Sequence, residues 1–307
     1  MRGITSVGII GAGALGLMYA SAFRRVPGTD VFFIADGHRL EQLTGRAFRV
    51  NGVEVTYPAR SPADVSPPDL MVVAVKNHHL PEIGPVVSRV CGEDTVVISV
   101  LNGIDSEPFL ERVAPTSRVI YTVAVGMDAM KDGNVLSFTR EGKLIIGTRD
   151  NESRAPEIER LSVFLRRAGL TVETPRDIHR AIWWKWMVNI GVNQVSAVLG
   201  APYRTFQAEG PARELMTGAM RETIAVAEAA GIDLHDDALV QWYEILSTLG
   251  PENKTSMLQD VEAGRTTEVG SFGGRLCELA REHDIPTPIN ETLVRLIAAR
   301  EGMAPGQ

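Results

Sequence analysis

Cysteine is scarce in this chain of 307 residues, with Cys91 and Cys277 its only two. Neither cysteine belongs to a C-x-x-C pair or stands near a pair of histidines, which argues against a disulfide framework and against a zinc site. The six histidines are scattered, and the adjacent His78 and His79 would point apart on a helix. We therefore expect no metal site, and the cytoplasm is the default compartment.

The chain also lacks an excess of basic charge and any long apolar run. Lysine and arginine number 31 against 38 aspartates and glutamates, for a formal net charge of −7. A nucleic-acid partner would require a basic face, so none is expected, although a local basic pocket for a small anion stays open. No run of about 18 apolar residues occurs, so no membrane span is expected. A hydrophobic content of 44% predicts a folded protein with room for two domains.

A glycine-rich turn stands near the start of the chain, between a predicted strand and a predicted helix. The strand Val7–Ile10 leads into Gly11-Ala12-Gly13-Ala14-Leu15-Gly16, and the helix Leu15–Phe23 follows. In such a G-x-G-x-x-G turn the first glycine permits the tight turn, the second lets the backbone approach a pyrophosphate, and the third lets the helix pack on the strand. The helix N-terminus then faces the anion. We expect these six residues to bind a dinucleotide.

The same segment also imitates a secretory signal. Arg2, an apolar stretch and the small residues Ala20-Ser21-Ala22 fit that pattern. Four glycines interrupt the apolar stretch, however, and a second predicted strand, Val31–Ile34, follows at the distance that a βαβ unit needs. The dinucleotide interpretation is therefore favoured.

Apolar strands alternate with helices through the first half of the chain. The strands after Val31–Ile34 are expected at Leu70–Val75, Val96–Val100 and Val119–Val125, and the helices after Leu15–Phe23 at Leu80–Val90 and Ser106–Val113. This order predicts a mainly parallel sheet covered on both faces, a Rossmann-type α/β domain. We expect a hairpin added to the sheet at Val135–Phe138 and Lys143–Gly147, then a helix at Ile158–Ala168 and a last short strand at Leu170–Val172.

The pattern changes after Pro175. From Asp177 to Ala298 the periodicity is helical, with breaks at Gly200-Ala201-Pro202, Gly231, Gly250-Pro251 and Pro286–Pro288. Asp177 is a suitable N-cap for the helix that follows it. The sequence thus predicts a Rossmann dinucleotide-binding domain at 1–175 and an all-helical domain at 176–307.

Three polar residues recur on the first predicted helix of the second domain. Lys185, Asn189 and Asn193 are spaced i, i+4, i+8 among tryptophans and aliphatic residues, which places them in one row about 12 Å long. A solvated stripe is one interpretation. Because such groups are costly to bury without partners, a row facing a cleft is the other. There the lysine could donate a proton, and the amides could bind carbonyl or carboxylate oxygens.

Further polar candidates follow elsewhere in the chain. Asn102 comes after a sheet strand, at the carboxyl end where ligands bind in open α/β sheets. Ser256 lies near Gln259, and this pair also fits a capping box, so Ser256 could simply start a helix. Glu268 follows Thr266-Thr267, and a single glutamate of this kind is more often a solvated carboxylate.

Together these segments resemble the ketopantoate reductase family along essentially the whole chain. The resemblance rests on the glycine loop, Val75-Lys76, Leu101-Asn102-Gly103, the Lys185–Asn193 helix, and Ser256–Asp260 ahead of Thr267-Glu268. It implies an oxidoreductase that uses NADPH to reduce the ketone of a 2-keto acid in a cleft between the two domains. The corresponding reaction converts 2-dehydropantoate to D-pantoate in pantothenate biosynthesis.

The resemblance also implies roles for the polar residues. Lys185 is the general acid that protonates the ketone oxygen, and Glu268 binds the hydroxyl end of the substrate and steadies Lys185. Asn102, Asn189, Asn193 and Ser256 hold the keto acid. Lys76 and Asn102 lie near the cofactor.

One position departs from the family pattern. Where members usually carry Ala-Arg-Gly, this chain has Ala35-Asp36-Gly37. Asp36 lies twenty residues beyond Gly16, where an acid bonds the ribose 2′-hydroxyl of NAD and repels the 2′-phosphate of NADP. His38 and Arg39 could still reach a phosphate. NAD is therefore slightly favoured over NADP.

The preference for NAD leaves the substrate open. An NAD-dependent D-2-hydroxy-acid dehydrogenase on the same fold is the alternative enzyme. A non-catalytic dinucleotide-sensing protein is a third hypothesis, although it would not need Lys185 and the convergent amides. A helical domain with exposed apolar positions could support a homodimer.

Overall fold

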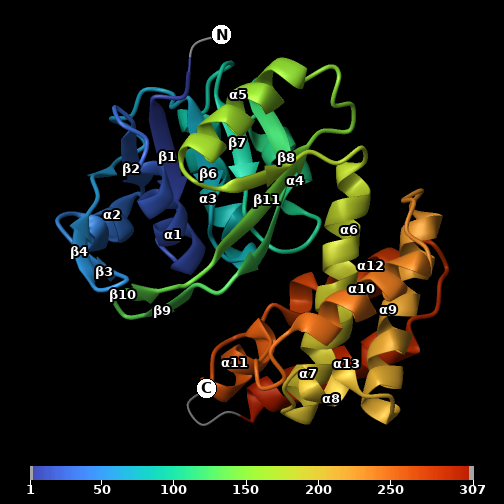
Figure 1. Cartoon of the computed structure of the whole chain (residues 1–307). Helices are drawn as coiled ribbons and strands as arrows, with labels where there is room; N and C mark the ends of the chain where they lie inside the picture. The colour runs from blue at the N-terminus through green and yellow to red at the C-terminus, as the bar shows by residue number, and fades with distance from the viewer. Residues whose placement is uncertain (1–2, 304–307) are drawn as a thin grey trace. The chain divides into compact units, whose positions relative to one another are not determined.

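An eight-stranded sheet forms the centre of the first half of the chain (Figure 1). The computed structural model describes residues 3–303. It separates into two compact units, Met1–Ala181 and Ile182–Gln307. The division falls within helix α6 (Ile178–Val188), a few residues beyond the predicted boundary at 175.

The strands of this sheet are parallel to their neighbours with one exception, the antiparallel pair β8 and β11. β1 is an interior strand that pairs with β6 and β2, so the described part of the segment that imitates a secretory signal is a buried strand and the helix after it. The mainly parallel Rossmann-type sheet predicted from the sequence is confirmed. In order across the sheet the strands are β12 (Thr171–Glu173), β11 (Glu141–Gly147), β8 (Arg118–Met127), β7 (Val96–Ser99), β6 (Leu70–Val73), β1 (Ser6–Ile10), β2 (Asp30–Ile34) and β5 (Ala59–Arg60).

Side chains of the interior strand β1 enter two separate cores, one on each face of the sheet. Val7 and Ile9 belong to the core that includes α1 (Ala14–Phe23) and α5 (Ala155–Arg167), while Ile10 belongs to the core with α3 (Leu80–Val90) and α4 (Ser106–Val113). This alternation follows from the two-residue period of a strand. Burial on both faces explains why the strands read as continuous apolar runs.

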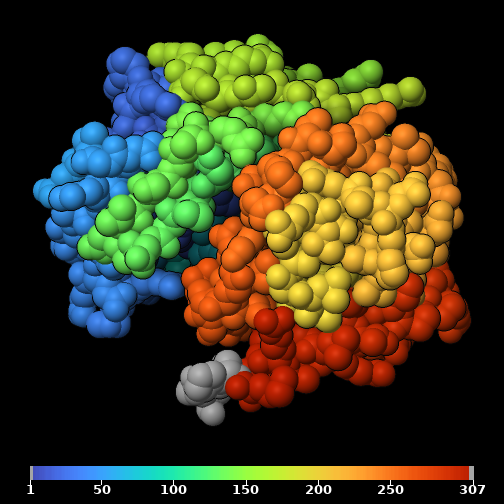
Figure 2. All heavy atoms as spheres, turned by 60° about the horizontal axis from the view of Figure 1, so that its bottom comes forward, coloured from blue at the N-terminus to red at the C-terminus, as the bar shows by residue number. Residues whose placement is uncertain are grey.

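A second, four-stranded sheet was not anticipated. Its order is β4 (Val53–Thr56), β3 (Ala47–Val50), β10 (Val135–Ser137) and β9 (Met130–Asp132), and it lies at the surface with blue β3 and β4 beside green β9 and β10 (Figures 1 and 2). The predicted hairpin of residues 135–138 with 143–147 is therefore wrong, because β10 pairs with β3 and β9 while β11 pairs with β8 and β12.

Helices make up the second unit, where no strand occurs among the described residues. The yellow, orange and red segments pack against one another (Figure 2). The Asp177 carboxylate accepts from the backbone N–H of Arg180 at 3.0 Å, which confirms the predicted N-cap of α6. After α6 come a π-helical turn (Asn189–Asn193), α7 (Gln194–Leu199), α8 (Arg204–Gln207), α9 (Pro211–Ala229), α10 (Asp237–Thr248), α11 (Ser256–Glu262), a 3₁₀ turn (Val269–Ser271), α12 (Gly273–Glu282) and α13 (Pro288–Gly302).

The breaks between these helices follow the predicted punctuation. Gly200 caps α7 with φ of 63° and Gly231 follows α9 with φ of 76°, a backbone conformation that favours glycine. Pro211 and Pro288 occupy the first turns of their helices, where no backbone donor is lost. Within the described residues, no helix is long and apolar enough to cross a membrane.

Candidate active site

Two glycines of the Gly11–Gly16 loop are required by contacts within the chain itself. Gly11 has φ of +106°, and a β-carbon there would lie 2.5 Å from the carbonyl oxygen of Ala74. A β-carbon on Gly16 would lie 1.9 Å from the carbonyl oxygen of Gly11. The tight turn and the close helix–strand packing expected of the first and third glycines are therefore both present.

Gly13 differs, because no contact within the described part of the chain demands a glycine there. Its φ is −75°, and the nearest atom to an added β-carbon would be the carbonyl oxygen of Ala74 at 3.8 Å. Gly13 is also exposed, and α1 begins after it with no side-chain cap and no acidic residue in its first turn. Open space beside uncapped N–H groups fits a dinucleotide pyrophosphate, which approaches the backbone at this position.

Lys76 and Asn102 lie near the glycine loop, at the carboxyl ends of adjacent strands. The loop follows β1, Lys76 follows β6, and Asn102 follows β7, and these strands are neighbours in the sheet. The side-chain amide of Asn77 donates to the backbone carbonyl oxygen of Asn102 at 2.7 Å. This bond joins the loop after β6 to the loop after β7. Sequence reasoning missed Asn77, although its place directly after Lys76 at a strand end was a signal.

Asp36 follows β2 at the same edge and starts helix α2 (Gly37–Leu43). Its carboxylate accepts from the backbone N–H of Gly37 at 2.8 Å, and the residue is exposed. The ring of His38 contacts Glu41 at 3.4 Å and Gln42 at 2.9 Å, both on its own helix. The Arg39 side chain is exposed and makes no hydrogen bond or ion pair within the described part of the chain.

Lys185, Asn189 and Asn193 follow one another along the start of the helical unit, but not on one continuous α-helix. Residues 189–193 form a π-helical turn between α6 and α7, so the uninterrupted helix expected from the sequence is wrong. The two asparagines still share a face, since the side-chain amide N–H of Asn193 donates to the side-chain amide oxygen of Asn189 at 3.4 Å. Asn193 is buried, and Lys185 and Asn189 are half-buried. π turns of this kind are frequent at functional sites.

Ser256 is the first residue of α11, but it is not the residue that caps the helix. Thr255 is the N-cap, and its hydroxyl accepts from the backbone N–H of Leu258. The capping box of Ser256 with Gln259 is therefore wrong, which leaves the exposed Ser256 side chain outside the cap. The Thr255 hydroxyl also donates to that of Ser196 at 3.0 Å, fastening the start of α11 to α7.

Glu268 immediately precedes the 3₁₀ turn Val269–Ser271 and is half-buried. The indole N–H of Trp186, the neighbour of Lys185 on α6, donates to the carbonyl oxygen of Ser271 at 3.0 Å. The turn that carries Glu268 is thus tied to the helix that carries Lys185. Sequence reasoning assigned no role to Trp186, because a tryptophan among apolar residues is expected simply to pack in the hydrophobic core.

A buried carboxyl group lies on the helix after Asn102. Glu107 accepts from the Ser106 hydroxyl at 2.8 Å and from the backbone N–H of Thr122 at 3.3 Å. Burial raises the pKa of Glu107 to about 7. No sequence signal distinguished this glutamate from a surface residue of an amphipathic helix.

His78 and His79 do not point apart as expected, because their ring centroids lie 4.1 Å from each other in a 3₁₀ turn. Among the described residues no group of three or more histidine, cysteine or acidic side chains could hold a metal ion.

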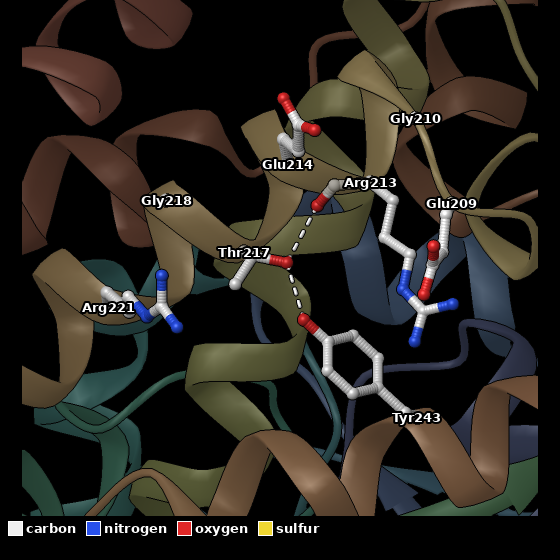
Figure 3. Close-up of a pocket in the computed structure, with 8 residues that line it drawn as sticks. All are labelled: Glu209, Gly210, Arg213, Glu214, Thr217, Gly218, Arg221 and Tyr243. Carbon is white, nitrogen blue, oxygen red and sulfur yellow. Dashed lines mark hydrogen bonds between the residues drawn. The ribbon is translucent and has the colours of Figure 1, made fainter.

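A separate pocket of about 330 Å³ opens on the helical unit (Figure 3). The Thr217 hydroxyl contacts that of Tyr243 at 2.6 Å, and the Arg213 guanidinium lies 4.1 Å from the centre of the Tyr243 ring. The pocket is lined by none of the predicted site residues.

Comparison with known proteins gives consistent matches over nearly the whole chain. The model "Ketopantoate reductase PanE/ApbA" matches residues 7–151, and "Ketopantoate reductase PanE/ApbA C terminal" matches residues 177–301. The 2-dehydropantoate 2-reductase of Archaeoglobus fulgidus is 28% identical, over 97% of this chain and 98% of its own length.

Two solved structures show the same fold. The dimeric ketopantoate reductase of Staphylococcus aureus has a TM-score of 0.80 at 23% identity, covering 97% of this chain and 99% of that one. D-mandelate dehydrogenase with NADH has a TM-score of 0.86 at 22% identity, with coverage of 97% and 99%. The first family model includes the glycine loop and the other predicted cofactor-binding residues, and the second includes Lys185 and the remaining predicted residues of the helical unit. The chain therefore belongs to the ketopantoate reductase family.

Proposed function

We propose that this protein reduces the ketone of a 2-keto acid with a reduced nicotinamide dinucleotide, and that its substrate is 2-dehydropantoate, which becomes D-pantoate for pantothenate biosynthesis. The observation that carries the proposal is the row of Lys185, Asn189 and Asn193, in which a π turn keeps the two amides 3.4 Å apart on one face. Membership of the family supports the reaction class, because the curated relative matched over nearly its whole length is named for this reaction.

The glycine loop would hold the cofactor. The residues that fit it are Gly11, Ala12, Gly13, Ala14, Leu15 and Gly16, with Lys76 and Asn102 at the neighbouring strand ends and Asp36 at the adenosine ribose. When bound, a reduced nicotinamide supplies the hydride that the ketone carbon receives.

The proton comes from this chain's own side chains. Lys185 gives a proton to the ketone oxygen, so that hydride and proton together convert the ketone to a secondary alcohol. Asn102, Asn189, Asn193 and Ser256 donate to the oxygens of the keto acid. Glu268 accepts from the hydroxyl end of the substrate and keeps Lys185 in place.

The choice between NAD and NADP rests on the edge of the sheet at β2. The exposed Asp36 carboxylate opposes a 2′-phosphate, and the His38 ring is engaged with Glu41 and Gln42. Both features favour NAD. The same features favour the alternative function, an NAD-dependent D-2-hydroxy-acid dehydrogenase, whose product would carry a different side chain.

The test is a kinetic comparison of substrates and cofactors. Nicotinamide absorbance is followed with 2-dehydropantoate and with a panel of 2-keto acids that includes aromatic and branched side chains, using NADH and NADPH separately. Highest kcat/KM for 2-dehydropantoate supports the proposal. Highest kcat/KM for another keto acid would favour the alternative dehydrogenase, and binding of a dinucleotide without any turnover would favour a sensing protein.

A homodimer in the cytoplasm is the proposed state of the enzyme. The helical unit exposes large apolar side chains, among them Leu199 at 50%, Val240 at 59% and Leu296 at 48%. The S. aureus neighbour is described as dimeric. Light scattering on the purified protein gives its mass in solution, and a mass of one chain at assay concentrations would contradict the dimer.

A further inference from the structure

The alignment of the polar row depends on the irregular turn between α6 and α7. In an uninterrupted α-helix, a residue eight positions beyond Lys185 would lie about 80° around the axis from it. A π turn accommodates one extra residue, so Asn193 takes the direction of the seventh position, about 20° from Lys185. The π turn at Asn189–Asn193 therefore brings Asn193 back to the side of the helix that carries Lys185.

A side chain replaces the backbone donor that this turn displaces. In an α-helix the N–H of residue 194 would donate to the carbonyl oxygen of Ile190, four residues earlier. Here the Gln194 backbone N–H donates to Gly191 instead, and the side-chain amide of Gln194 donates to the Ile190 oxygen at 2.8 Å. The buried carbonyl is thus satisfied in the π conformation.

A second acceptor fixes the direction of the Gln194 amide. Its nitrogen also donates to the side-chain oxygen of Asn290 at 2.9 Å, and the Asn290 amide donates to Glu222 at 2.7 Å and to the carbonyl of Ala219 at 3.1 Å. Gln194 and Asn290 are both fully buried. The network runs from α13 and α9 to the π turn.

Two glycines make room for this arrangement. A β-carbon on Gly273 would lie 2.2 Å from the side-chain oxygen of Gln194. A β-carbon on Gly191, within the π turn, would lie 2.4 Å from Met220. The turn and the glutamine that supports it are therefore closely packed on both sides.

The side-chain oxygen of Gln194 has no hydrogen-bond partner among residues 3–303, and a buried unpaired acceptor is unfavourable. An apolar side chain of the same length would avoid that cost. The advantage of an amide at this position therefore lies in the two hydrogen bonds that its nitrogen donates.

From these contacts we propose that Gln194 is a positioning residue, which holds the π turn and thereby aligns Asn189 and Asn193 for the keto acid. The kinetic consequence rests on the proposed function, whereas the effect on the backbone does not. Gln194 acts through the two asparagines and is not itself expected to touch substrate.

The first experiment replaces the amide by a side chain of similar length. Gln194→Met should raise KM for the keto acid about tenfold or more, with KM for the dinucleotide unchanged. Thr287→Val is the matched control, because it removes a buried hydroxyl of the same unit that donates to the Cys277 sulfur at 3.6 Å and makes no hydrogen bond to Gln194 or Asn290 among the described residues. The control should leave both KM values at those of the parent, so a general loss of packing is separated from a loss of alignment.

A second variant makes the role of Gln194 depend on pH. In Gln194→Glu, a protonated carboxyl can still donate to the Ile190 oxygen, whereas the ionised form cannot, and burial favours the neutral form. KM for the keto acid should therefore be near the parent value at low pH and rise with pH more steeply than in the parent. The nearby Glu222 carboxylate is present in both proteins, so the parent profile is the reference.

A crystal structure of Gln194→Met provides the readout that needs no turnover. We expect residues 189–193 to revert to an α-helical turn, with the two asparagine side chains separated. A π turn that persists, together with parent kinetics, would overturn the proposal. If the parent reduces no keto acid, the proposed function fails, and the crystal structure alone then decides whether Gln194 holds the turn. If Gln194→Met does not fold, the pH profile of Gln194→Glu decides the kinetic role, and a profile parallel to the parent's refutes it.

Discussion

A β-carbon on Gly16 would stand 1.9 Å from the carbonyl oxygen of Gly11, whereas one on Gly13 would meet nothing closer than 3.8 Å. Two glycines of one motif thus serve different purposes. Gly16 is needed for the contact of α1 with the turn before it, and Gly13 leaves open space beside the helix N-terminus.

This contrast separates folding from cofactor binding. Gly16→Ala should lower the free energy of unfolding by more than about 3 kcal/mol, because the clash is with backbone that cannot move aside. Gly13→Ala should unfold at nearly the parent denaturant concentration but bind the dinucleotide at least about tenfold more weakly. Urea unfolding and fluorescence titration with NADH and NADPH measure the two effects. If Gly13→Ala binds both dinucleotides with the affinity of the parent, the pyrophosphate does not bind at this loop.

Lys185 is expected to be the proton donor. Lys185→Ala should lower kcat by about 10²–10⁴-fold with dinucleotide affinity little changed, since a general acid acts in the transition state. Lys254→Ala is the control, because Lys254 is an exposed lysine of the same unit paired with Glu262 at 2.7 Å. Steady-state kinetics with saturating dinucleotide give kcat for each variant. A kcat within a few-fold of the parent in Lys185→Ala would exclude this role.

Asn189 and Asn193 should behave as a coupled pair. Each alanine variant is expected to cost about 1–3 kcal/mol in kcat/KM for the keto acid, and the double variant less than the sum, because the amides contact each other at 3.4 Å and would bind one substrate. A double-mutant cycle on kcat/KM measures the coupling. Strict additivity would mean that the two side chains serve separate purposes.

The glycine loop and the mainly parallel character of the main sheet could be read from the sequence, because both follow from short-range patterns. An apolar strand before G-x-G-x-x-G predicts the turn, and continuous apolar runs predict strands buried on both faces. The same pattern could not reveal which strands pair at a distance. Val135–Ser137 pairs with Ala47–Val50 through contacts that no local pattern encodes.

One missed element did have a local signal. Asn51 and Gly52 have φ of 46° and 85° and join β3 to β4 as a two-residue hairpin turn, for which Asn-Gly is the preferred sequence. The π turn had no such signal. Its support comes from the Gln194 side chain and from Asn290, which is 96 residues further along the chain. The candidate residues of the polar row could therefore be predicted, but their alignment could not.

Stability should depend on pH through Glu107. Burial raises the pKa of the Glu107 carboxyl group to about 7 in the folded state, above its ordinary value of 4.5. The protonated Glu107 therefore makes its full contribution to the free energy of unfolding below about pH 4.5, and this contribution is lost as pH rises through 7. Glu107→Gln keeps one acceptor and one donor, so it should match the parent at low pH and exceed its free energy of unfolding by up to about 3 kcal/mol at pH 8. Urea unfolding across this range measures the difference, with the exposed Glu54→Gln as control. A constant difference at all pH values would contradict the raised pKa.

The cofactor preference is expected to depend on Asp36. Its carboxylate is exposed at the end of β2, where it opposes the charge of a 2′-phosphate and caps α2 through the N–H of Gly37 at 2.8 Å. Asp36→Arg should shift the ratio of kcat/KM values towards NADPH by about 10–100-fold, because it removes a repulsion and adds a phosphate partner. Asp36→Asn keeps the capping oxygen and removes only the charge, so it should give a smaller shift in the same direction. A parent that already prefers NADPH strongly would mean that Arg39, whose side chain makes no hydrogen bond or ion pair within the described residues, supplies the phosphate contact. The Asp36 carboxylate would then not decide the choice.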